Sequence, residues 1–405
     1  MRFIIILLIN VSLMNCNINI TETTNKIRSV LFKYKNNRYP RCTGLDKIDS
    51  FVGKSLRLVE NTEGFGEFLK VYNVSECLMK QSGDYIYSHI MDGLIVHEDL
   101  PESHWHEYKV IHVKNYSTDH HERAAQRKWR HNLRRIARHN RDFIAGKQSY
   151  SLHLNFFGDF VNYFRKFLKL FHTIPLFDPA EDHDKTAYRR SAHRTVPSKL
   201  DWRSKGFKPR LEEQHQCGAC YAFAVTHAVQ AQLYKKHGVW GELSPQQIVD
   251  CSGNDGNMGC DGGSLRAALR YAAREGLITE ARYPYVGKKE RCKYNSLQVR
   301  VRARRWATLP AGDEAAIERT LATIGPLAVA VNAAPFTFQL YSGIYDDLFC
   351  TPWQLNHAML LVGYTPQYWI LLNWWGKNWG EDGYIRIRRG FNRCGVTNMA
   401  TYVEL

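Results

Sequence analysis

The stretch Gln214-His-Gln-Cys-Gly-Ala-Cys-Tyr-Ala-Phe223 constrains this chain more than any other part of its sequence. From Cys220 to Leu233 there is neither proline nor glycine, which predicts a helix beginning near Cys220. A thiol at a helix N-terminus lies beside free backbone N–H groups and the positive end of the helix dipole, and both stabilise a thiolate. The stretch therefore predicts a cysteine nucleophile, although a C-x-x-C pair also occurs in redox and zinc sites.

The number of cysteines bears on these alternatives. The chain has 405 residues and ten cysteines. Residues 1–16 combine a basic Arg2 with an apolar run, as a secretory signal peptide does, and its removal takes Cys16 away. The nine that remain would meet an oxidising compartment, where an odd number leaves one free thiol or an intermolecular bridge. Four disulfides and a free Cys220 would account for all nine.

Charge and hydropathy argue against several classes of partner. The formal net charge is +16, concentrated in residues 123–141, 189–194 and 300–305. We interpret these segments as solvated surface and expect no nucleic-acid partner, because a secreted chain without a reading motif rarely meets one. No later apolar run reaches spanning length, so we expect no membrane span. The histidine clusters lack cysteines or carboxylates at ligand spacing, so we expect no metal and no cofactor.

The part before the enzyme domain divides into two segments. Residues 17–119 are predicted to be a β-rich N-terminal extension, with strands at 84–90 and 108–113. Residues 120–195 begin with a basic helix predicted at 122–144 and end in an exposed linker suited to cleavage. The extension also contains a predicted Cys42–Cys77 disulfide and glycosylation sequons at Asn19, Asn73 and Asn115.

Residues 196–405 combine a helical first half with a strand-rich second half. Helices are predicted at 219–236, 244–250 and 264–275, and strands at 327–331, 358–364, 368–372 and 383–388. This pattern indicates an α+β fold in which a cleft separates a helical lobe from a β lobe.

Three further side chains supply what a cysteine nucleophile needs, namely a base, a group that orients the base and an oxyanion donor. Gln214 precedes Cys220 by six residues, His357 begins an apolar strand, and Asn373 ends the next strand. Alone, such a histidine or asparagine is more often structural. Cys217-Gly-Ala-Cys220-Tyr nevertheless matches a C-G-[SA]-C-[WY] signature that has histidine and asparagine about 130 to 150 residues downstream.

With these residues the chain resembles the papain family of cysteine proteases, nearest to its cathepsin L-like group, from about residue 122 to 405. The resemblance implies a papain-like two-lobe fold behind a helical inhibitory propeptide. Other matching segments are Val196–Trp202, Gly259–Gly263, Tyr283–Tyr285, Gly325-Pro326, Gly376–Tyr384 and Cys394-Gly395.

The resemblance implies a role for each catalytic position. Cys220 is the nucleophile, and His357 is the general base and then the acid. Asn373 orients the imidazole, Gln214 donates to the oxyanion, and Trp375 shields the bond between His357 and Asn373. The implied disulfides are Cys217–Cys260, Cys251–Cys292 and Cys350–Cys394.

A substrate site is implied as well. Gly263 would offer its backbone to the substrate strand. The pocket for the residue two before the scissile bond is apolar throughout, so we expect a hydrophobic or aromatic side chain there rather than arginine. Its implied lining is Leu265, Ala330, Leu355, Ala358 and Met399.

The upstream match is to the inhibitory propeptides of the family, which occupy the cleft in reverse direction until they are removed, here near Val196. The helical signature departs from the usual one, because Ala125 stands at its usual arginine and Glu122 lies one position from its leading acid. The matching residues are Trp129, Asn132, Ile136, Asn140 and the segment Asn155-Phe-Phe-Gly-Asp159.

Three residues near the nucleophile also depart from the usual pattern. Tyr221 replaces tryptophan, Ala219 replaces serine, and Trp374 replaces a serine next to Asn373. We expect Trp374 to reshape the primed side of the cleft and to leave catalysis intact. No occluding loop follows Cys260, which favours an endopeptidase.

We therefore expect a lysosomal or secreted cysteine endopeptidase that cleaves proteins and peptides. Its own propeptide and cystatin-like proteins would inhibit it. Two alternatives stay open. One is a catalytically silent homologue that binds or regulates, and the other is a dipeptidyl exopeptidase in which residues 17–119 act as an exclusion domain.

Overall fold

The computed structural model describes residues 102–160 and 195–405, apart from 239 and 240. The chain divides into two compact units, Met1–Asn140 and Arg141–Leu405. Several predictions lie outside the described residues, namely the strand at 84–90, the linker at 178–194, the disulfide of Cys42 with Cys77, and the sequons at Asn19 and Asn73. Among the residues that are described, no helix is both long and apolar enough to cross a bilayer.

Two helices, α7 (Glu102–Ile111) and α8 (Asp119–Ile144), dominate the described part of the first unit. The strand predicted at 108–113 is wrong, because this segment is largely the end of α7. The alternating pattern misleads because Trp105 and Tyr108, one helical turn apart, both pack on Trp129 at ring distances of 5.5 and 6.1 Å. Val110, by contrast, is 65% exposed. The helix predicted at 122–144 is confirmed, and it begins three residues earlier.

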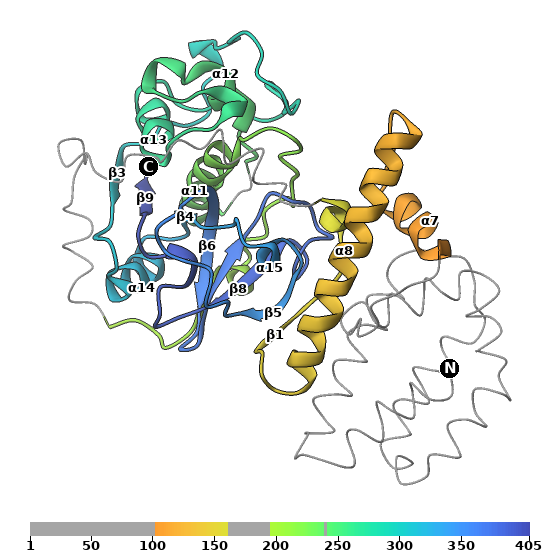
Figure 1. Ribbon diagram of the computed structural model, residues 1–405. Helices are drawn as coiled ribbons and strands as arrows, with labels where there is room; N and C mark the ends of the chain where they lie inside the picture. Colours follow the sequence, from red (N-terminus) through yellow and green to blue (C-terminus); the bar gives the residue numbers. More distant parts are fainter. Residues whose placement is uncertain (1–101, 161–194, 239–240) are drawn as a thin grey trace, which may run out of the picture. The chain divides into compact units, whose positions relative to one another are not determined.

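A mixed sheet forms the strand-rich part of the second unit (Figure 1). The order along it is β1-β5-β8-β7-β6-β4-β9-β3, and β2 pairs with β6. The pair β5 and β8 is parallel, and the other pairs are antiparallel. The strands are β1 (Tyr150–Leu152), β2 (Leu200–Asp201), β3 (Arg305–Thr308), β4 (Leu327–Val331), β5 (Tyr341–Tyr345), β6 (His357–Tyr364), β7 (Tyr368–Leu372), β8 (Tyr384–Arg388) and β9 (Ala400–Glu404).

Helix α11 (Cys220–His237) lies between the helical part and the sheet (Figure 1). It contacts α12 and α13 on one side and β4, β6 and β9 on the other, and it is buried from Cys220 to Leu233. The predicted α+β arrangement of a helical half beside a β half is therefore confirmed. The other α-helices are α12 (Pro245–Cys251), α13 (Leu265–Arg274), α14 (Glu314–Thr323) and α15 (Phe336–Gln339). The 3-10 helices are Phe156–Asp159, Trp202–Lys205, Gly253–Asp255, Gly259–Asp261, Ser296–Gln298 and Arg393–Gly395.

Candidate active site

Cys220 is the first residue of α11, and its side chain lies at the junction of the two halves. The turn before it is fixed by the Cys217–Cys260 disulfide and by a 2.8 Å hydrogen bond from Gly218 N to the Cys260 carbonyl. Backbone N–H groups of Cys220, Tyr221 and Ala358 act on the thiol and lower its pKa, but burial outweighs them and raises the pKa of Cys220 to about 11.

His357 and Asn373 are brought together by the antiparallel pairing of β6 and β7. His357 opens β6, Asn373 follows β7, and Nε2 of the ring lies 2.7 Å from Oδ1 of the amide. Because Oδ1 accepts, Nε2 carries the hydrogen, and Nδ1 keeps the lone pair that a general base needs. Trp375 stacks on the ring at 5.0 Å. Burial lowers the pKa of His357 to about 4.

The helix that begins with the nucleophile packs on the strand that begins with the base, because α11 contacts β6. Ala358, whose N–H acts on the Cys220 thiol, directly follows His357 in the strand. Both side chains are buried, at 3% and 4% exposed. Burial raises the pKa of the thiol and lowers the pKa of the imidazole, so in each case it favours the uncharged form.

Gln214 is held on three sides beside the turn that carries Cys220. Its Nε2 donates to the Cys217 carbonyl at 2.8 Å, and its backbone N donates to the Trp374 carbonyl at 2.9 Å. The carbonyl of Gln214 accepts from the Tyr285 hydroxyl at 2.8 Å. A side-chain amide nitrogen has two hydrogens. One therefore remains for a ligand oxygen.

The described residues form the disulfides Cys217–Cys260, Cys251–Cys292 and Cys350–Cys394. Among the described cysteines, Cys220 is the one without a disulfide. These are the three pairs that the resemblance implies. Asn115 is exposed in the connection between α7 and α8. A glycan could reach it there, so it stays a predicted acceptor.

Tyr221 and Gly263 are packed against each other. The Tyr221 hydroxyl donates to the Gly259 carbonyl at 3.0 Å, and a Cβ added at Gly263 would lie 2.8 Å from the Tyr221 ring. The side chain that follows the nucleophile thus supports the segment expected to hold the substrate strand.

The residues expected to line the substrate pocket come from neighbouring elements. Ala330 and Ala358 are opposite each other in β4 and β6, and Ala330 N donates to the Met399 carbonyl at 2.9 Å. Leu265 opens α13, which contacts β4 and β9, and Leu355 precedes β6. All five side chains are at most 9% exposed.

Trp374 has a different place from the one predicted. It is fully buried, stacked on Phe223 of α11 at 5.5 Å, and its Nε1 donates to the Ala358 carbonyl at 2.9 Å. It therefore joins the helix to the sheet beneath the site and offers no surface to the cleft. The expectation that it reshapes the primed side is wrong, because a large ring next to Asn373 packs inward against apolar and aromatic neighbours.

The sequence motif at residues 155–159 contacts the site within the second unit. β1 pairs with β5, Asn155 Nδ2 donates to the Gln339 carbonyl at 2.7 Å, and Asn155 Oδ1 caps the following turn by accepting from Phe157 N. Phe157, which is 7% exposed, meets Trp375 edge-on at 5.0 Å. This segment therefore covers the ring that stacks on His357.

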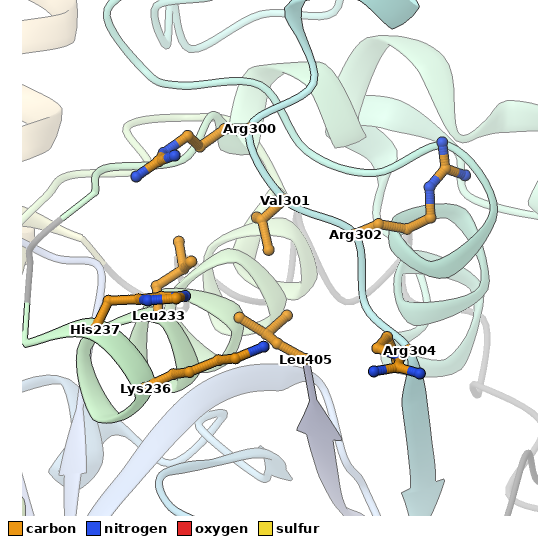
Figure 2. A pocket seen from close by; sticks show the side chains of 8 residues that line it. All are labelled: Leu233, Lys236, His237, Arg300, Val301, Arg302, Arg304 and Leu405. Carbon is orange, nitrogen blue, oxygen red and sulfur yellow. The ribbon is translucent and has the colours of Figure 1, made fainter.

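A separate surface hollow of about 560 Å³ lies at the other end of α11 (Figure 2). Leu233 in its wall is thirteen residues after Cys220, which corresponds to about 20 Å along the helix. The hollow shares no residue with the site. Its lining is Leu233, Lys236, His237, Arg300, Val301, Arg302, Arg304 and Leu405.

Sequence reasoning missed two titratable residues close to the site, Glu212 and His227. His227 Nε2 lies 3.3 Å from Oε2 of Glu212, and its ring is 4.5 Å from that of Trp374. A signal was present, since a residue seven positions after Cys220 falls on the same face of a helix.

A thiol, an imidazole and an orienting amide at the junction of two halves of an α+β fold define a thiol-dependent hydrolase. Residues 196–404 match the family described as papain family cysteine protease. The chain is 38% identical to cathepsin L of Sarcophaga peregrina over 315 residues, 75% of this chain and 93% of that protein. It is 35% identical to cathepsin K of Mus musculus over 315 residues, 76% and 94% of the two proteins.

A solved structure gives the same result. Digestive procathepsin L 3 from the larval midgut of Tenebrio molitor aligns with a TM-score of 0.68 and 34% identity, covering 76% of this chain and 100% of that one. The chain belongs to the papain family of cysteine proteases, as a cathepsin L-like peptidase with the papain-like fold. Alignment with a procathepsin fits a propeptide that inhibits within its own chain.

Gly218→Ala tests how the nucleophile is held. Its Cβ would lie 2.6 Å from the Cys260 carbonyl oxygen, which is backbone and cannot easily move. We expect a loss of stability of about 1 to 3 kcal/mol from overpacking. We also expect a fall in kcat/KM of up to about 10²-fold, because a misplaced nucleophile reacts slowly.

Urea unfolding and peptide hydrolysis would measure these two effects. Gly253→Ala is the matched control, since nothing lies within 4 Å of its added Cβ. Equal behaviour of the two variants would contradict this account of the turn.

Proposed function

We propose that this protein is a cysteine endopeptidase that works through a thioester intermediate and is made as a zymogen. The observation that carries the proposal is the hydrogen bond from His357 to Asn373. The thiol of Cys220 is at the start of α11, which packs on β6, the strand that begins with His357. Because Nε2 donates in the bond to Asn373, the lone pair of the neutral imidazole is on Nδ1, the atom that we propose takes the thiol proton.

The proposed reaction has two halves. His357 Nδ1 removes the proton of Cys220, and the thiolate adds to the scissile carbonyl. The resulting oxyanion accepts hydrogen bonds from the backbone N–H of Cys220 and from Nε2 of Gln214. His357 then protonates the leaving amine as the C–N bond breaks. Water, deprotonated by the same imidazole, hydrolyses the thioester and restores the thiol.

The closed site supports a resting form that reacts slowly. Burial favours the neutral thiol, and a neutral thiol is a poor nucleophile. Entry of water or substrate would reduce the desolvation of both groups and favour the thiolate and imidazolium. Removal of the prosegment is the proposed event that opens the site.

Labelling of Cys220 by an epoxysuccinyl inhibitor tests the proposal. We expect slow labelling of the precursor and fast labelling after acid processing, because processing exposes the thiol. Mass spectrometry of the labelled peptide would locate the adduct. Absence of any label after processing would favour the silent homologue, and failure to cleave N-terminally blocked peptides would favour the exopeptidase.

The proposed specificity is for an apolar residue two before the scissile bond. The small side chains of Ala330 and Ala358 with the thioether of Met399 place no charge in the proposed pocket. A peptide library should therefore give hydrophobic or aromatic residues at that position. Met399→Glu should shift the profile toward arginine or lysine, and a wild-type profile dominated by arginine would refute the assignment.

The proposed prosegment includes both described helices of the first unit. The packing of Trp105 on Trp129 and the hydrogen bond from Trp105 Nε1 to Glu122, 3.2 Å long, support one helical hairpin. We therefore propose that the prosegment starts before Glu102 rather than at residue 120. We propose that the prosegment is removed in a lysosomal or extracellular compartment and that the enzyme works there.

Phe157→Ala tests how the prosegment holds the site. Truncation removes the ring that covers Trp375 and should weaken the binding of the prosegment at the site. Replacing a buried phenylalanine by alanine costs about 3 to 5 kcal/mol of stability. We expect self-processing at pH 5 to be at least about tenfold faster. Phe156→Ala is the matched control, because Phe156 is the neighbouring residue and is 48% exposed. Gel analysis of the time course measures both, and equal rates for the two variants would count against this contact.

A further inference from the structure

Next to the catalytic residues, Glu212 and His227 form a largely buried pair of titratable side chains that the proposed reaction does not use. His227 comes two helical turns after Cys220 in α11, and its side chain is 1% exposed, while that of Glu212 is 13% exposed. His227 Nε2 lies 3.3 Å from Oε2 of Glu212, and Nδ1 lies 3.0 Å from the Phe223 carbonyl oxygen.

The hydrogen bond to Phe223 indicates which nitrogen of the His227 ring carries a proton. A carbonyl oxygen only accepts, so Nδ1 of His227 donates to Phe223. In a neutral ring Nε2 is then an acceptor, and a protonated Glu212 carboxyl can donate to it. Burial supports this state, because it raises the pKa of Glu212 to about 8 and lowers the pKa of His227 to about 4.

The pair contacts the catalytic site through Trp374. The His227 ring is 4.5 Å from the Trp374 ring, on the helix that begins with the nucleophile. Trp374 N donates to Asn373 Oδ1 at 2.8 Å, the same oxygen that accepts from His357. A shift of the tryptophan would therefore act directly on the group that orients the base.

The main chain of Glu212 makes a second connection. Its carbonyl accepts from Gly376 N at 3.2 Å, and Gln214 N donates to the Trp374 carbonyl at 2.9 Å. Between these bonds, Glu213 and Trp375 form a β-bridge. Glu212 thus holds the loop after Asn373 by its backbone and α11 by its side chain.

We propose that Glu212 and His227 are positioning residues, a neutral hydrogen-bonded acid and base that fix Trp374 and through it the Asn373 and Gln214 segments. The inference rests on the proposed function, since it concerns the geometry of the same reaction. Neither residue is placed to touch the substrate.

The surroundings of the pair set its pH range. The neighbouring carboxylates of Glu280 and Glu242 also raise the pKa of Glu212, whereas Arg210 lowers it. Tyr285 faces Glu212 as well. Burial is the largest effect on the pKa of His227 and lowers it, whereas hydrogen bonds to the backbones of Phe223 and Arg210 raise it. Above about pH 8 the carboxyl would ionise, and below about pH 4 the ring would, so either change puts a charge beside Trp374.

The linked effect on stability has a definite sign. Because the folded-state pKa of Glu212 is raised, the folded protein binds more protons than the unfolded chain between its ordinary value of 4.5 and about 8. The stability that this carboxyl contributes is complete below pH 4.5 and is lost as the pH rises through 8. Glu212→Gln keeps a donor toward Nε2 but cannot ionise, so it should remove this loss.

Kinetics on the processed enzyme test the proposal. We expect Glu212→Ala to lower kcat by about 10- to 100-fold with KM changed less than about threefold, because geometry rather than substrate binding is affected. Glu212→Gln should recover most of that loss and move the alkaline fall of kcat to higher pH. Glu290→Gln, the same change on a partly exposed acid that does not act on the pKa of Glu212, should match the wild type.

Thermal unfolding in a Cys220→Ala background provides a readout that does not need activity. Between pH 4.5 and 8 the melting temperature should fall less in the Glu212→Gln variant than in its parent. Equal pH dependence of the two melting temperatures would overturn the proposed role of the pair. A Glu212→Gln enzyme that is no more active than Glu212→Ala would overturn it as well. If the pH difference were present but the wild-type enzyme were inactive and unlabelled, the pair would be supported and the proposed function overturned.

Discussion

The short backbone pairing between residues 212–214 and 374–376 is the interaction on which the rest of the site depends. Gln214 N donates to the Trp374 carbonyl, Gly376 N donates to the Glu212 carbonyl, and Glu213 bridges Trp375 between them. One segment carries the proposed oxyanion donor, and the other carries the amide that orients the base. Groups from the helical half and from the sheet are thereby fixed relative to each other through the main chain.

Burial gives this arrangement its chemistry as well as its stability. The thiol at the start of α11 has favourable N–H neighbours, yet desolvation is the larger effect on its pKa. The imidazole of His357 is affected in the opposite direction by the same cause. Desolvation thus opposes the charged form of both groups, so access of water to the site would change their chemistry.

The sequence predicted the long regular elements and the site for specific physical reasons. Apolar runs at 327–331 and 368–372 coincide with β4 and β7, because buried strands of a sheet need side chains that are apolar on both faces. The short strand β3, which begins at exposed Arg305, gave no such pattern and was missed. At Tyr108 a local alternation suggested a strand, whereas packing on Trp129 selects a helix. Trp374 shows the remaining limit, since the direction in which a ring packs depends on Phe223 and His227, which are distant in sequence.

The turn before α11 has a consequence for when the protein can become an enzyme. The position of Cys220 depends on Cys260, which is 43 residues away from Cys217 and is joined to it by a disulfide. A chain that has been synthesised but not yet oxidised lacks this covalent anchor. Formation of this disulfide is therefore one of the events that place the nucleophile, in addition to the folding of α11 itself.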